Sequence, residues 1–244
     1  MYYRFRASRF YRGSATADTV GCNLRCLYCW SWRFNSRLEG VFYSPKDVAS
    51  KLVAIAEDKG YKVVRISGGE PTIAFTHLIQ VLEHLQEYLR NKKSLFVLET
   101  NGILIGYRRD YAELLSRFSN IAVRISIKGC SEEEFEKITG ADKVFFSFQL
   151  QALKNLLDHN IKVWPVATIS FCSAKSLASL LERLARIDEN LVSGLEYEYF
   201  KAYPASVKRL CKAGLLPRLS ILVEERRVLN SNEFGELCRK YSQT

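Results

Sequence analysis

Residues 14–30 of this 244-residue chain read SATADTVGCNLRCLYCW. We expect a strand over residues 14–20, and it runs directly into a loop that carries Cys22, Cys26 and Cys29. Three thiols at spacings of four and three residues can converge on one centre from a single loop. Because thiolates are soft ligands that suit zinc, copper(I) or iron–sulfur clusters, the loop predicts a metal site at the end of this strand.

The choice of metal depends on the number of ligands. A structural zinc site takes four protein ligands, and the sequence has no cysteine or histidine between Cys29 and His77. A 4Fe–4S cluster can instead be held by three cysteines, with one iron left open for a small molecule. The spacing therefore favours a cluster, with zinc as the alternative.

Strand-like runs recur along the chain with helical stretches between them. The helical stretches begin at capping residues such as Ser44 and Ser131, or they carry apolar residues at three- and four-residue spacing. The candidate strands are Ser14–Val20, Lys62–Ser67, Leu95–Glu99, Ile121–Ile127, Ile161–Ile169 and Leu195–Phe200. Six β-α units predict an α/β fold with parallel strands, a partial (β/α)6 TIM-type barrel, with a doubly wound sheet as the alternative.

The chain is expected to form one domain over residues 1–244. Its core spans about residues 14–200, after a basic aromatic N-terminal arm over residues 1–13. From residue 201 on, prolines, glycines and asparagines break the pattern into short pieces, so residues 201–244 are predicted to be a C-terminal extension.

Polar motifs stand at the ends of three further strands, where ligands gather in both candidate folds. They are Gly68-Gly69-Glu70-Pro71, then Glu99-Thr100-Asn101-Gly102, then Ser126 and Lys128, which share one face of a strand by alternation. Paired glycines allow a ligand to approach the backbone closely, and a lysine on an apolar strand favours an anion. Taken singly, each motif also fits an ordinary turn or a lysine that emerges at a strand end.

Together, the four strand ends resemble the radical S-adenosylmethionine (SAM) superfamily. The resemblance implies a 4Fe–4S cluster on Cys22, Cys26 and Cys29, with SAM on its open iron. The implied SAM contacts are Tyr28 at the adenine, Gly68, Gly69 and Glu70 at the methionine amino group, and Thr100, Ser126 and Lys128 at the carboxylate and ribose. It also implies an oxidoreductase in which SAM is cleaved reductively to a 5′-deoxyadenosyl radical that abstracts hydrogen from a substrate.

Within the superfamily, the sequence is most similar to the activating enzymes of glycyl-radical enzymes, such as pyruvate formate-lyase activase. That similarity implies a partner protein as substrate and a reductant protein of the ferredoxin or flavodoxin type. The sequence departs from the activases at Ser126, where they carry aspartate, and at Phe135, where they carry histidine. The alternatives are a radical SAM enzyme that modifies RNA or a nucleotide-like small molecule, and, in another class, a basic zinc-containing RNA-binding module.

The charge of the chain is uneven. The formal net charge is +10, of which residues 1–40 and residues 201–244 carry +5 each. An acidic partner such as RNA is therefore plausible, and the alternating rings and arginines of residues 1–13 would suit it. The alternative for that arm is an edge strand with buried rings. No apolar run is long enough to span a membrane and residues 1–13 do not form a secretory signal, so we expect a cytoplasmic protein.

The other cysteines lie far apart in the sequence, with no spacing typical of ligands. They are Cys130, Cys172, Cys211 and Cys238. For a cytoplasmic chain we expect no disulfide framework, and we expect these four to be small buried hydrophobic side chains.

Overall fold

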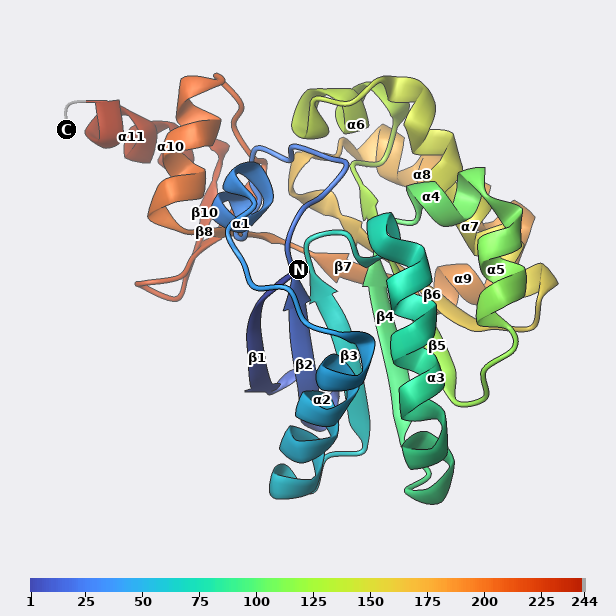
Figure 1. The fold of residues 1–244 in the computed structure, drawn as a ribbon. Helices are drawn as coiled ribbons and strands as arrows, with labels where there is room; N and C mark the ends of the chain where they lie inside the picture. The colour runs from blue at the N-terminus through green and yellow to red at the C-terminus, as the bar shows by residue number, and fades with distance from the viewer. Residues whose placement is uncertain (243–244) are drawn as a thin grey trace. The chain divides into compact units, whose positions relative to one another are not determined.

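The computed structural model describes residues 1–242, so the last two residues of the predicted C-terminal extension lie outside the described residues. Its large sheet has seven strands in the order β1 to β7 (Figure 1). The strands are β1 (Tyr2–Ser8), β2 (Ser14–Thr19), β3 (Val63–Gly68), β4 (Leu95–Thr100), β5 (Ile121–Lys128), β6 (Lys162–Thr168) and β7 (Glu196–Glu198). The six predicted strands correspond to β2–β7, and the α/β fold with a mainly parallel sheet is confirmed.

The pairing of the strands agrees with consecutive β-α units. The pairs β2–β3, β3–β4, β4–β5 and β6–β7 are parallel. Strand β1 is the exception, because it pairs antiparallel with β2 at the end of the strand order. The N-terminal arm is therefore largely an edge strand, and the ring of Tyr2 is buried.

Several helices begin at capping residues that the sequence offers. Ser44 and Ser131 each accept a hydrogen bond from a backbone N–H of the first turn, at Asp47 and Glu134. The helices are α1 (Trp32–Arg37), α2 (Pro45–Lys59), α3 (Phe75–Asn91), α4 (Ile103–Tyr107), α5 (Arg109–Leu115), α6 (Glu132–Thr139), α7 (Phe146–Asp158), α8 (Ala174–Ile187), α9 (Glu189–Ser193), α10 (Pro204–Lys212) and α11 (Ser231–Ser242). Short 3-10 helices cover Phe10–Arg12, Pro71–Ala74, Lys143–Phe145 and Ile169–Phe171.

The chain divides into two compact units. The first consists of residues 1–23, 33–126 and 148–164. The second consists of residues 24–32, 127–147 and the described residues from 165 on. The cysteine loop contributes its first part to one unit and its second part to the other.

In the first unit, the two faces of the sheet differ in polarity. Helices α2 and α3 lie side by side over one face (Figure 1), and the strand residues on that face are apolar, as at Val64, Ile66 and Leu98. The opposite face of β2 and β3 carries polar residues instead, because Thr16 is in register with Arg65 and Asp18 with Ser67. Alternation along each strand thus separates an apolar core from a polar face.

The second unit has its own apolar core around a small sheet. That sheet consists of β8 (Phe200–Ala202), β9 (Leu219–Leu222) and β10 (Arg227–Asn230), and α10 and α11 pack beside it (Figure 1). Phe171, Phe200, Leu210 and Phe234 are buried together there, and Leu27 and Tyr28 of the cysteine loop pack against them. Most of the C-terminal extension therefore folds as part of this unit.

Two disulfides in the second unit contradict the expectation from the sequence. Cys130 is bonded to Cys172, and Cys211 to Cys238. The partners are far apart in sequence but close in the fold: Cys130 and Cys172 follow the neighbouring strands β5 and β6, and the other pair joins α10 to α11. The expectation that these four cysteines are unpaired hydrophobic side chains was wrong, because their spacing in the sequence does not predict which of them are close in the fold.

Among residues 1–242, no helix is both long enough and apolar enough to cross a membrane.

Candidate functional site

In the first unit, the Gly-Gly-Glu segment fits closely against the end of β2. The N–H of Gly69 donates to the carbonyl of Thr19 (2.9 Å), and the N–H of Glu70 donates to the carbonyl of Gly21 (2.7 Å). A Cβ atom on Gly69 would lie 2.1 Å from the carbonyl oxygen of Gly21, so no other residue fits without backbone movement. Gly68 has a φ of 96°, which glycine adopts readily. The segment thus fixes the start of the cysteine loop.

The carboxylate of Glu70 joins this segment to the end of β4. One oxygen accepts from the backbone N–H and hydroxyl of Thr72 and from the hydroxyl of Thr100, and the other accepts from the N–H of Asn101. The two hydroxyl bonds are 2.6 Å long, and Glu70 is 3% exposed. Glu70 and Thr100, which the sequence assigns to SAM, therefore also hold two strand ends together.

Asn101 connects the same strand end to the first cysteine. Its side-chain amide donates to the Oδ1 of Asn23 at 2.7 Å and lies 3.9 Å from the Sγ of Cys22. Gln149 of α7 donates to the carbonyls of Asn101 and Ser126, which fixes the ends of β4 and β5 relative to each other. Sequence reasoning did not assign Asn101 and Gln149 to the site, although Asn101 belongs to one of its motifs.

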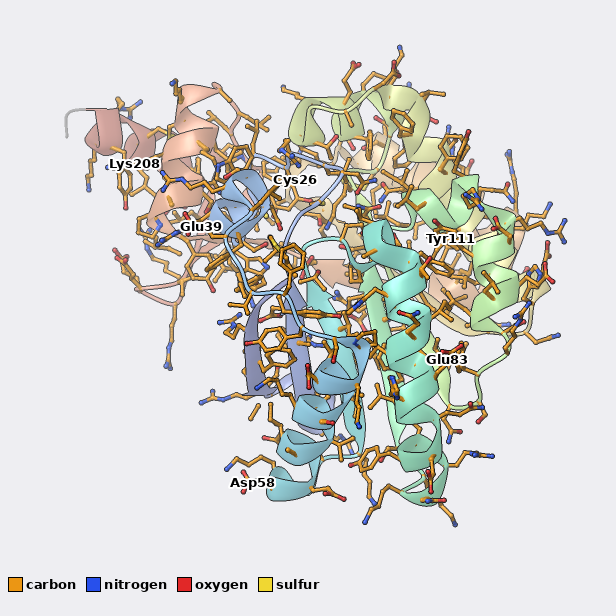
Figure 2. The ribbon with its side chains drawn as sticks, in the orientation of Figure 1. Cys26, Glu39, Asp58, Glu83, Tyr111 and Lys208 are labelled. Carbon is orange, nitrogen blue, oxygen red and sulfur yellow. A yellow bond between two sulfur atoms is a disulfide. The ribbon has the colours of Figure 1, made fainter. Side chains whose placement is uncertain are left out.

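In the second unit, Cys26, Tyr28, Cys29 and Lys128 form a second group of predicted site residues. Cys26, which Figure 2 labels, is buried, and burial raises the pKa of its thiol to about 11, while Lys128 opposes that rise. The hydroxyl of Tyr28 donates to Thr168 (3.4 Å), and the Lys128 Nζ lies 5.9 Å from the centre of the Tyr28 ring. A cation therefore stands beside both the ring and the buried thiol.

The donor set fits an iron–sulfur cluster. Cys22, Cys26 and Cys29 are not in disulfides, while the other four cysteines are. A buried thiol with a raised pKa must lose its proton to bind metal, and metal cations supply the charge that compensates a buried thiolate.

Comparison with known proteins identifies the family. A model of the Radical SAM superfamily matches residues 17–172, more than half of the chain. The chain belongs to the Radical SAM superfamily. Members of this superfamily are enzymes that use a 4Fe–4S cluster and SAM, so the enzyme class and both cofactors predicted from the sequence are confirmed.

Curated relatives of this radical SAM chain include cyclases. It is 30% identical over 148 residues to a GTP 3′,8-cyclase of Clostridium perfringens (strain SM101 / Type A), which covers 59% of this chain and 42% of the relative. A probable GTP 3′,8-cyclase of Pyrococcus horikoshii is 24% identical over 224 residues, which cover 86% of this chain and 66% of the relative. The chain spans less than half the length of the Clostridium enzyme.

Solved radical SAM structures share the fold. Streptococcus suis SuiB bound to the precursor peptide SuiA has a TM-score of 0.59 at 19% identity, over 76% of this chain and 38% of SuiB. Native anSMEcpe with bound AdoMet and the Cp18Cys peptide has a TM-score of 0.58 at 20% identity, over 80% of this chain and 55% of that protein. At these identities the likeness concerns the fold alone.

Sequence reasoning missed a network of charges on the polar face of the first unit. The polar face consists of the residues on β1 to β5 that lie on the sheet face opposite Val64, Ile66 and Leu98: Arg4, Arg6, Thr16, Asp18, Arg65, Ser67, Glu99 and Arg124. Asp18 is fully buried and accepts from Arg4 (2.7 Å) and Arg6 (2.8 Å). Its four arginines and two carboxylates give the polar face a formal net charge of +2.

Glu99 is the second carboxylate of the polar face. It accepts from Ser67 and Tyr11 at 2.6 Å each, and Arg65 pairs with it at 3.1 Å. Burial by itself raises the pKa of Glu99, but the charges of Arg65 and Arg124 and the two hydroxyl donors outweigh it, so the pKa is lowered. The signal in the sequence was the alternation of polar residues with alanine, valine and isoleucine along β2, β3 and β5.

Proposed function

We propose that this chain binds a 4Fe–4S cluster through Cys22, Cys26 and Cys29 and generates a radical from SAM. When bound, these cofactors supply an electron and a 5′-deoxyadenosyl radical that removes hydrogen from the substrate. The observation that carries the proposal is that the three cysteines of one loop lie outside the disulfides, while the other four cysteines are bonded in pairs. The residues proposed to contact SAM are Tyr28, Gly68, Gly69, Glu70, Thr100, Ser126 and Lys128.

The chain's own residues would orient the cofactor. The N–H groups of Gly69 and Glu70 already donate within the protein, so this edge would meet the methionine ammonium through carbonyl oxygens. Lys128 would neutralise an anionic group, because its ammonium lies near the Tyr28 ring and the buried Cys26 thiol. The hydrogen bonds of Glu70 to the end of β4 would keep Thr100 and Asn101 in place beside the ligand.

For the substrate we favour an anionic, nucleotide-like small molecule. The net charge of +2 on the polar face supports a phosphate-bearing ligand, and the exposed ring of Phe10, 4.9 Å from the Arg65 guanidinium, could stack on a base. The relatives from C. perfringens and P. horikoshii are GTP 3′,8-cyclases by name, so GTP is the first nucleotide to test.

A partner protein is the second candidate substrate. Two solved structures with the same fold, SuiB and anSMEcpe, hold peptides, and this supports an activase-like or peptide-modifying role. In either case we propose a reductant protein of the ferredoxin or flavodoxin type as electron donor. The net charge of +10 would attract an acidic carrier.

Isotope transfer distinguishes the two candidates. Anaerobic, reduced protein is incubated with SAM and GTP deuterated on the ribose, and 5′-deoxyadenosine is analysed by mass spectrometry. A nucleotide substrate predicts deuterium in 5′-deoxyadenosine, tighter binding of GTP than of guanosine, and weaker GTP binding by Arg4→Gln but not by Arg90→Gln, an exposed control on α3. If 5′-deoxyadenosine forms without deuterium and GTP does not bind, the nucleotide is rejected and a protein partner is favoured.

A further inference from the structure

Arg209 of α10 makes two contacts with the cysteine loop and one with Trp32 at the start of α1, although it lies outside the region that matches the superfamily. Its Nε donates to the carbonyl oxygen of Leu27 at 3.0 Å, and its Nη2 donates to the carbonyl oxygen of Cys29. The guanidinium carbon lies 4.7 Å from the centre of the Trp32 ring, within the range of a cation–π interaction. One side chain of the C-terminal extension thus binds the loop at its last cysteine.

The helix that carries Arg209 is firmly held. Val207 and Leu210 on either side of it are buried in the apolar core of the second unit. The next residue, Cys211, is bonded to Cys238 of α11. Because packing and a disulfide fix the helix, Arg209 can restrain the cysteine loop instead of moving with it.

The cysteine loop also forms backbone hydrogen bonds with α6. The backbone N–H groups of Arg25 and Leu27 donate to the carbonyls of Thr139 and Ile138, at 3.0 and 2.9 Å. In these bonds the N–H groups of the loop donate, whereas in the bonds with Arg209 the carbonyl groups of the loop accept. Within the segment that joins Cys26 to Cys29, the carbonyl of Cys26 accepts from the N–H of Cys29 (3.0 Å), and Arg209 donates to the carbonyls of Leu27 and Cys29.

We propose that Arg209 is a positioning residue for the cluster, which fixes the Cys26–Cys29 segment through two loop carbonyls and places a positive charge beside Cys29. The inference rests on the proposed binding of a cluster by this loop. A nearby positive charge stabilises the reduced cluster, which carries one more electron, and so raises its reduction potential. The planar fork of arginine suits two carbonyl acceptors, while lysine keeps the charge without that geometry.

The test compares Arg209→Gln and Arg209→Lys with Lys212→Gln, a control that removes an exposed charge from the same helix. Hydrogen exchange of residues 24–32 is measured on the cluster-free protein, and the midpoint potential is measured on reconstituted protein by electron paramagnetic resonance. Arg209→Gln should speed exchange of the loop at least about tenfold, because charge-assisted hydrogen bonds are lost. Its cluster should have a more negative potential, which Arg209→Lys largely restores.

The outcomes separate the inference from the proposed function. If the wild-type protein binds no cluster, the proposed function fails, and this inference fails with it. If the wild type binds a cluster but Arg209→Gln matches Lys212→Gln in loop exchange and potential, only the role of Arg209 is rejected. A lower cluster content with an unchanged potential in the remaining cluster would show a structural role alone and would overturn the electrostatic part.

Discussion

Replacing Glu70 by glutamine tests how the ends of β3 and β4 are joined. The carboxylate accepts four hydrogen bonds, and the isosteric amide can accept only at its oxygen. With that oxygen facing Thr72 and Thr100, the amide NH2 group faces the N–H of Asn101, and that buried donor loses its acceptor. One lost bond to a charged group costs about 2 kcal/mol, and weaker bonds to a neutral oxygen add about 1 kcal/mol, for a total of about 3 kcal/mol.

Two measurements on the cluster-free protein check this value. Unfolding in guanidinium chloride should show Glu70→Gln destabilised by about 3 kcal/mol, and the Asn101 amide should exchange about 30-fold or more faster than in the wild type. The matched control is Glu83→Gln, on an exposed position of α3 (Figure 2). Destabilisation by less than about 0.5 kcal/mol, with unchanged exchange at Asn101, would refute the account of this junction.

Three further predictions concern other parts of the fold. Gly69→Ala should destabilise the protein by about 3 kcal/mol and weaken SAM binding, because the added methyl group meets a backbone oxygen, whereas Gly235→Ala should be nearly neutral. Glu99→Gln should destabilise the protein by about 3 kcal/mol at neutral pH. Because the pKa of Glu99 is lowered in the folded protein, its ionised carboxylate stabilises the fold above the ordinary pKa of 4.5, and this stabilisation is lost as the pH falls. The difference in unfolding free energy between the variant and the wild type should therefore narrow below pH 4.5. Cys238→Ser, which opens the 27-residue loop to Cys211, should cost about 3.5 kcal/mol.

Each of these predictions has an outcome that contradicts it. Equal stability of the two glycine variants would mean that the close approach at Gly69 is not present. A constant gap between Glu99→Gln and the wild type across the acid range would mean that the carboxylate is not stabilised by its arginines. Equal stability of Cys238→Ser and the wild type, with a free thiol detected at Cys211 of the wild type, would mean that Cys211 and Cys238 do not form a disulfide.

The sequence predicted the sheet well because each parallel strand is a local signal. The strands β2 to β7 alternate with helices along the chain, and their order in space follows their order in the sequence. Strands β8, β9 and β10 were not predicted, because these strands of three or four residues lie in or next to the stretch that prolines, glycines and asparagines break into short pieces. Strand β1 was ambiguous because its alternating rings and arginines fit both an edge strand and an RNA-binding arm.

The site was predictable only in part, for a physical reason. Motifs that are contiguous in sequence, such as the cysteine loop and Gly68-Gly69-Glu70, were visible at once, and their assignments to cluster and SAM remain predictions. Contacts between residues that are far apart in the sequence correspond to no contiguous motif. Two examples are the disulfide between Cys130 and Cys172 and the hydrogen bond from Arg209 to the cysteine loop. Both depend on which elements lie side by side in the fold.

The most direct test of the central claim is the yield of 5′-deoxyadenosine from SAM, measured with anaerobically reconstituted and reduced protein. We predict that the wild-type chain produces it and that Cys26→Ala, which removes the buried thiol, produces none. No product from a wild-type protein that contains iron and sulfide, or equal product from Cys26→Ala, would contradict the account.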